Sequence, residues 1–145
     1  MQAALSGVVT GNDQHVGFRA MIMKQAIEYN LAGVAKNQTD GTVDFTLQGD
    51  QDRLDPALAA IRDGTKKSSD IDVHSAPASV SANLDTFTIV DWTSTTRNIA
   101  TPYTLVFKRR GHDKVISKSE AKEVWREILR TTLKGEDLQK LGPDD

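Results

Sequence analysis

The spacing of apolar and polar residues predicts alternating strands and helices in the first 92 residues. Val43, Phe45 and Leu47 alternate with polar residues, which is typical of a strand with one buried face. The pair Asp40-Gly41 just before this run predicts a hairpin turn, because glycine accepts the positive φ angle that such turns require. The predicted strands span residues 3–9, 34–38, 42–48 and 86–90, with a further extended stretch at residues 71–73.

Two helices are predicted between these strands. Residues 19–30 are too continuously apolar for a strand and long enough for a helix with a broad buried face. Apolar residues at helical spacing from Leu54 to Ile61 predict the second helix, and Gly64 is expected to end it. The order strand, helix, two strands, helix, strand predicts an α+β fold of the ferredoxin-like split βαβ sandwich type, in which two helices cover an antiparallel sheet.

A strand and a helix are predicted after this unit, so we expect residues 1–92 to form one domain and residues 93–145 a C-terminal strand-helix extension. Residues 103–107 alternate as a strand, and Ser117 with Glu120 forms a capping box before an apolar stripe that runs to Leu133. A two-helix sandwich already buries its own core, so this stripe needs further apolar surface. We expect it to build a homo-oligomer, with packing on its own sheet as the alternative.

The amino-acid composition excludes several kinds of functional site and segment. The chain has 145 residues and no cysteine, which excludes disulfides, thiolate metal sites and cysteine nucleophiles. No apolar run approaches the length of a membrane span, and the first residues lack the pattern of a secretory signal. We therefore expect a soluble, cytoplasmic protein without membrane contact.

Charge is distributed unevenly along the chain. Residues 1–92 hold 7 Lys and Arg against 12 Asp and Glu, a net of −5, and residues 93–145 hold 11 against 8, a net of +3; the sum is the −2 of the whole chain. An acidic body does not attract a phosphorylated ligand through its overall field. Any anion binding must therefore come from a local arrangement of residues.

The stretch from Gly11 to Arg19 has the outline of such an arrangement. It leaves a strand at small and polar residues and enters a helix at Arg19. A turn that feeds a helix N-terminus directs unpaired backbone N–H groups into one concavity, where the helix dipole adds positive charge. Arg19 can hold two oxygens of a phosphate or carboxylate with its planar fork.

The same residues resemble the signature loop of the acylphosphatases. The loop match is carried by Gln14, Val16, Gly17, Phe18 and Arg19. A second motif, Leu31-Ala32-Gly33-Val34-Ala35-Lys36-Asn37 followed by Asp40-Gly41-Thr42-Val43, resembles the family's second strand, its catalytic asparagine and the turn after it. The resemblance covers about the first two thirds of the chain, and the residues beyond it form an extension without a counterpart in the small acylphosphatases.

This resemblance implies an enzyme that hydrolyses the carboxyl-phosphate bond of small acyl phosphates. Arg19 and the loop of residues 14–19, which includes His15, would bind the phosphoryl group, and Asn37 would position the attacking water. Phosphate or sulfate is expected as a product-like ligand. The family's scheme needs no metal and no cofactor, because positioning and charge stabilisation promote the phosphoryl transfer.

Two positions depart from the family pattern: Asp13 stands where valine is usual, and His15 where glycine is usual. We expect Asp13 to end the strand and His15 to point to solvent, so that the loop still binds anions. Alternatively, protonated His15 compensates Asp13 and supplies a further donor to the phosphate. The corresponding alternative function is a catalytically weak or silent acylphosphatase-like domain for anion binding or assembly.

The run Lys108-Arg109-Arg110 raises the separate hypothesis of a nucleic-acid or anionic-partner binding module. Acidic and basic residues alternate on the following helix, which is typical of a self-compensating solvated face. The sequence pI of about 5.9 is also far below that of nucleic-acid-binding domains. We therefore expect no nucleic-acid partner.

Overall fold

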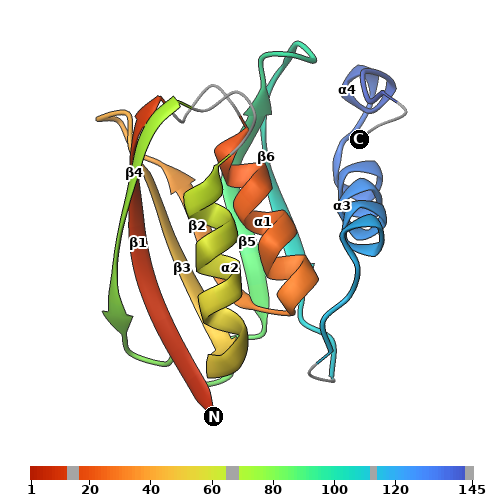
Figure 1. The fold of residues 1–145 in the computed structure, drawn as a ribbon. Helices are drawn as coiled ribbons and strands as arrows, with labels where there is room; N and C mark the ends of the chain where they lie inside the picture. Colours follow the sequence, from red (N-terminus) through yellow and green to blue (C-terminus); the bar gives the residue numbers. More distant parts are fainter. Residues whose placement is uncertain (13–16, 65–68, 112–113, 143–145) are drawn as a thin grey trace.

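Six strands pair into one sheet in the order β4-β1-β3-β2-β5-β6 (Figure 1). The computed structural model describes residues 1–12, 17–64, 69–111 and 114–142. The strands are β1 (Gln2–Asn12), β2 (Ala32–Asn37), β3 (Val43–Asp50), β4 (Ser69–Ala78), β5 (Thr86–Ser94) and β6 (Ile99–Lys108). The helices are α1 (Phe18–Tyr29), α2 (Gln51–Asp63), α3 (Lys118–Thr132) and the short α4 (Glu136–Gln139).

The pairing directions decide which strand ends lie together. Strands β1 and β2 both run antiparallel to β3, and β5 runs parallel to β2. Strands β1, β2 and β5 therefore point the same way, and their last residues lie at one end of the sheet. Helix α1 begins at that end, directly after β1 in the chain (Figure 1).

One face of the sheet is covered by the helices α2, α1 and α3 (Figure 1). The strands turn alternate residues toward this layer, as Val43, Phe45 and Leu47 do in β3. The core between sheet and helices contains these largest fully buried side chains: Phe18, Ile22, Met23, Ile27, Leu31, Phe45, Leu47, Ile61, Phe87, Ile89, Ile99 and Leu105.

The predicted fold class is confirmed, and so are the predicted strands and helices within a few residues of their ends. Gly64 is the C-cap of α2, as predicted. Two details differ from the sequence prediction. The stretch at residues 71–73 belongs to a full strand, β4, at the sheet edge beside β1. The predicted strand at residues 86–90 is therefore the fifth strand of the sheet, β5. It pairs parallel with β2, so the sheet is mixed and not purely antiparallel as predicted.

The C-terminal strand and helix pack on the rest of the same chain. Strand β6 pairs antiparallel with β5, and α3 lies against α1 and β6. Ser117 Oγ accepts from the backbone N–H of Glu120 at 3.1 Å, which is the predicted cap of α3. Trp125 meets Trp92 edge to face, with ring centroids 6.2 Å apart. The stripe is thus covered within its own chain: Ala121, Trp125, Leu129 and Leu133 are buried, and Val124 and Ile128 are partly buried.

Candidate active site

Arg19 lies in the first turn of α1 with only 9% of its surface exposed. Its Nη1 donates to two backbone carbonyls of β5, to Asp91 O at 2.8 Å and to Val90 O at 3.3 Å. No described residue accepts a hydrogen bond from Nε or Nη2 of Arg19. The carbonyls therefore fix the plane of the guanidinium and leave one edge with parallel N–H donors, the geometry that binds two oxygens of one anion.

The environment of Arg19 strengthens its attraction for an anion. Burial lowers the pKa of the Arg19 guanidinium, and the nearby Asp91 carboxylate opposes this shift. An arginine remains charged despite such a shift, because its ordinary pKa lies far above neutrality. A partly desolvated cation acts through a lower effective dielectric than a cation in bulk water, so its pull on a phosphate oxygen is stronger.

The start of α1 adds backbone donors beside Arg19. Gly17 is the N-cap residue, with a left-handed backbone at φ 75°, and no side chain caps the helix in the described chain. The first turn contains no acidic residue. The first N–H groups of a helix have no partner within the helix and sit at the positive end of its dipole. Of the predicted loop, Gly17, Phe18 and Arg19 are described; Gln14, His15 and Val16 lie outside the described residues, as does Asp13.

Asn37 is the last residue of β2. Along this strand, Ala35 is buried and Lys36 is exposed, so alternation turns Asn37 toward the helix-covered face of the sheet. The Oδ1 atom of Asn37 is buried and accepts no hydrogen bond from any described residue. A buried acceptor without a partner costs about 1–3 kcal/mol, so a water or a ligand group with a free proton is the expected occupant beside it.

The sheet register brings Arg19 and Asn37 to one end of the molecule. The parallel pairing of β2 with β5 ends at Ala35 and Ile89. Asn37 and Asp91 each lie two residues beyond that pair, and the Asp91 carbonyl holds Arg19. The two residues that the sequence singled out, 18 positions apart in the chain, thus share the end of the sheet where α1 begins.

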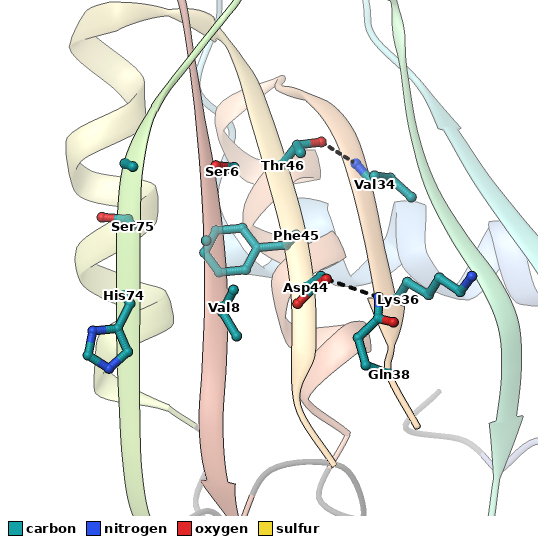
Figure 2. A pocket seen from close by; sticks show the side chains of 12 residues that line it. Ser6, Val8, Val34, Lys36, Gln38, Asp44, Phe45, Thr46, His74 and Ser75 are labelled. Atoms are coloured by element: carbon teal, nitrogen blue, oxygen red, sulfur yellow. Dashed lines mark hydrogen bonds between the residues drawn. The ribbon is translucent and has the colours of Figure 1, made fainter. Parts of the chain in front are cut away.

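A hollow of about 560 Å³ lies on the other face of the sheet (Figure 2), and neither Arg19 nor Asn37 lines it. Its lining includes Val8, Val34 and Lys36, and Gln38 donates to Asp44 at 3.0 Å on its rim. Lys36 precedes Asn37 in β2 and points to the opposite face. The hollow is therefore separate from the candidate active site.

The basic run Lys108-Arg109-Arg110 meets the C-terminal end of α1. Arg109 Nε donates to Asn30 O at 2.9 Å, and Arg110 Nη2 donates to Ile27 O at 3.2 Å. These carbonyls lie at the negative end of the helix dipole, where cations are favoured. The two arginines therefore stabilise the end of α1.

None of the described helices is long and apolar enough to cross a membrane.

Sequence reasoning missed the contribution of Val90 and Asp91, although a signal was present. Phe87 and Ile89 alternate as buried residues, but the next buried residue is Trp92, three positions on. A shift of one residue in the alternation is what a β-bulge produces. An aspartate inside an apolar strand is a second sign, because aspartate is depleted in regular strands.

Comparison with known proteins decides the family. A family model described as Acylphosphatase matches residues 5–89, which is 85 of the 145 residues. The chain belongs to the acylphosphatase family. Membership confirms the predicted enzyme class, and the matched range contains both Arg19 and Asn37. The second half of β5, β6 and α3 lie beyond it.

Individual acylphosphatases agree with this assignment. The chain is 40% identical to the acylphosphatase of Chlorobaculum tepidum over 62 residues, which cover 43% of this chain and 67% of that protein. It is 34% identical to the acylphosphatase of Geobacillus kaustophilus over 83 residues, which cover 57% of this chain and 88% of that protein.

Two solved structures show the same fold. An acylphosphatase from Coxiella burnetii has a TM-score of 0.50 at 22% identity and covers 61% of this chain and 92% of its own. Full-length HypF, solved in a phosphate- and nucleotide-bound form, has a TM-score of 0.57 at 22% identity and covers 72% of this chain and 14% of its own. At this level of identity both structures inform the fold alone.

Proposed function

We propose that the protein hydrolyses the carboxyl-phosphate bond of small acyl phosphates at the end of the sheet where α1 begins. Arg19 and the loop of residues 14–19 bind the phosphoryl group, and Asn37 positions the attacking water. The observation that carries this proposal is the buried Oδ1 of Asn37, which accepts no hydrogen bond from the residues that the structure describes. A buried acceptor at the same end of the sheet as an arginine whose Nε and Nη2 bond no described residue suits one water and one oxyanion. These are the two species that the reaction brings together.

Arg19 is proposed to bind the phosphoryl group through Nε and Nη2. These donors lie on the same edge of the guanidinium, so they bond two oxygens of one phosphate. The two hydrogen bonds from Nη1 to the carbonyls of Val90 and Asp91 support this role, because they hold the free edge in one orientation. Donors that are already oriented before the substrate arrives stabilise the charge of the transition state without reorganising.

Asn37 is proposed to accept a hydrogen bond from the attacking water through Oδ1. The water oxygen attacks phosphorus from the side opposite the acyl oxygen, and the bond between phosphorus and that oxygen breaks. The carboxylate leaves with the electron pair, one water proton stays on the new phosphate hydroxyl, and the other passes to phosphate or solvent. A carboxylate is a good leaving group, so positioning and charge stabilisation suffice without a side-chain base.

The test is hydrolysis of benzoyl phosphate, followed by ultraviolet absorbance in the presence of a chelator, together with calorimetric binding of inorganic phosphate. We expect the wild-type protein to turn over with the chelator present. Arg19→Ala should abolish turnover and weaken phosphate binding. Asn37→Ala should lower kcat about 100-fold or more, as loss of an oriented catalytic group does, while the phosphate Kd changes by less than about threefold.

Gln38→Ala is the matched control, because it removes a neighbouring amide that bonds Asp44 on the other face of the sheet. Its kcat and KM should equal those of the wild type. Full activity in Arg19→Ala would reject the phosphate-binding role, and equal falls of turnover and phosphate affinity in Asn37→Ala would reject the water-positioning role. Phosphate binding without turnover in the wild type would favour the alternative of a silent anion-binding domain.

The homo-oligomer and the cytoplasmic location stay predictions from the sequence. The apolar side chains of α3 have partners in their own chain, so an oligomer would have to use another surface. Light scattering on the full chain over the micromolar range tests assembly. A mass of one chain at every concentration would reject it.

A further inference from the structure

Strand β5 contains one extra residue beside Arg19. In its pairing with β6, Ile89 lies opposite Leu105 and Trp92 lies opposite Tyr103. Three steps along β5 thus correspond to two steps along β6, which defines a β-bulge. The bulge comprises Val90 and Asp91, whose carbonyls bond Arg19.

The bulge explains how one guanidinium nitrogen reaches two successive carbonyls. In a regular strand, successive carbonyls point to opposite sides, so a single Nη1 atom cannot bond both. Asp91 has φ 56°, in the left-handed region, and this turn of the backbone redirects its carbonyl toward Arg19. The pairing of β5 with β2 ends at Ile89, so β2 does not compete for these carbonyls in the parallel ladder.

The residue type at position 91 suits this backbone. Non-glycine residues rarely adopt a positive φ, and aspartate and asparagine do so several times more often than other residues. A β-branched residue at such a position is strongly disfavoured. The Asp91 side chain is itself exposed, and its carboxylate accepts no hydrogen bond from any described residue.

We infer that Asp91 is a positioning residue for Arg19, and that its left-handed backbone, not its carboxylate, does the positioning. The redirected carbonyl holds Nη1 so that Nε and Nη2 face the phosphoryl group. This inference rests on the proposed function, in which Arg19 binds phosphate. The inference extends the proposed function, because it assigns a role to Asp91, which lies outside residues 5–89 matched by the acylphosphatase family model. The Coulombic effect of Asp91 on the pKa of Arg19 is then a secondary consequence of their closeness.

Substitutions at position 91 separate the backbone from the carboxylate. Asp91→Asn and Asp91→Gly remove the charge and keep the left-handed conformation accessible, so both should retain KM and the phosphate Kd within about twofold. Asp91→Val opposes that conformation. It should raise KM for benzoyl phosphate and Kd for inorganic phosphate at least about tenfold, because a displacement of about 1 Å in a positioned group can cost 100-fold.

Asn83→Val is the matched control. Asn83 has φ 62° in the turn before β5, so the same substitution strains the same kind of backbone away from Arg19. We expect both valine variants to lower Tm, and only Asp91→Val to weaken phosphate binding. If Asp91→Val does not fold, Asp91→Ala gives the same comparison with a smaller strain.

Each outcome decides a different point. Unchanged phosphate affinity in Asp91→Val, or a loss in Asp91→Asn as large as in the valine variant, would overturn the positioning role of the backbone. Unchanged phosphate affinity in Arg19→Ala would instead overturn the proposed role of Arg19. Because phosphate binding is measured without turnover, the position-91 comparison holds even for a wild type that hydrolyses no acyl phosphate.

Discussion

Trp125 connects the C-terminal extension to the acylphosphatase fold, so its removal measures how firmly α3 is packed. The indole is only 4% exposed, and it meets Trp92 edge to face at 6.2 Å between centroids. Lys24 Nζ lies 5.3 Å from its centroid. Truncation of a buried tryptophan to alanine costs about 3–5 kcal/mol, which includes about 0.5–1.5 for the aromatic pair and about 0.5–1 for the cation.

We therefore expect Trp125→Ala to lower the free energy of unfolding by about 4 kcal/mol. This is a large fraction of the roughly 5–15 kcal/mol that stabilises a domain. The corresponding fall in Tm is about 10 °C for a chain of this size. Urea titration followed by far-ultraviolet circular dichroism gives the free energy, and calorimetry gives Tm.

Glu127→Ala is the control for Trp125→Ala, because Glu127 is exposed on the same helix and its substitution should change stability by less than about 0.5 kcal/mol. A loss below about 1 kcal/mol in Trp125→Ala would refute the packing of α3 on Trp92. The apolar stripe of α3 would then be available to a neighbouring chain, and light scattering should show an oligomer.

Two further predictions concern the same extension. Ser117→Ala removes the side-chain acceptor of the Glu120 N–H and should destabilise the protein by about 1 kcal/mol in urea titration, whereas Ser117→Asp should not, because aspartate also caps. The hydrogen bond from Tyr103 Oη to Asp137, supported by Lys140, lowers the pKa of the Asp137 carboxyl. This contribution to stability is present above the ordinary aspartate pKa of about 3.9 and is lost as pH falls through the lowered value in the folded state. The Tm difference between wild type and Tyr103→Phe should therefore be largest near neutrality and shrink in acid, and a difference independent of pH would contradict the role of Asp137.

The sequence by itself determined the local elements. Three local features depend on residues within a few positions of one another: the alternation in β3, the Asp40-Gly41 turn and the Ser117–Glu120 cap. Such signals act through local backbone preferences and through the burial of one face, so a single sequence reveals them. The order of the elements then indicated the ferredoxin-like arrangement, and the loop and second-strand motifs indicated Arg19 and Asn37.

The tertiary structure decided which of these residues meet. The parallel pairing of β2 with β5 brings the end of β2 beside the bulge of Val90 and Asp91, and the bulge holds Arg19. It also decided that the stripe of α3 is covered by α1 and that Arg109 and Arg110 bind the end of α1 and do not form a free basic surface. The hydrogen bonds of Arg19, Arg109 and Arg110 join residues 71 to 83 positions apart in the chain. Local propensity does not encode such a pairing, because the pairing depends on which buried surfaces fit together in the assembled sheet.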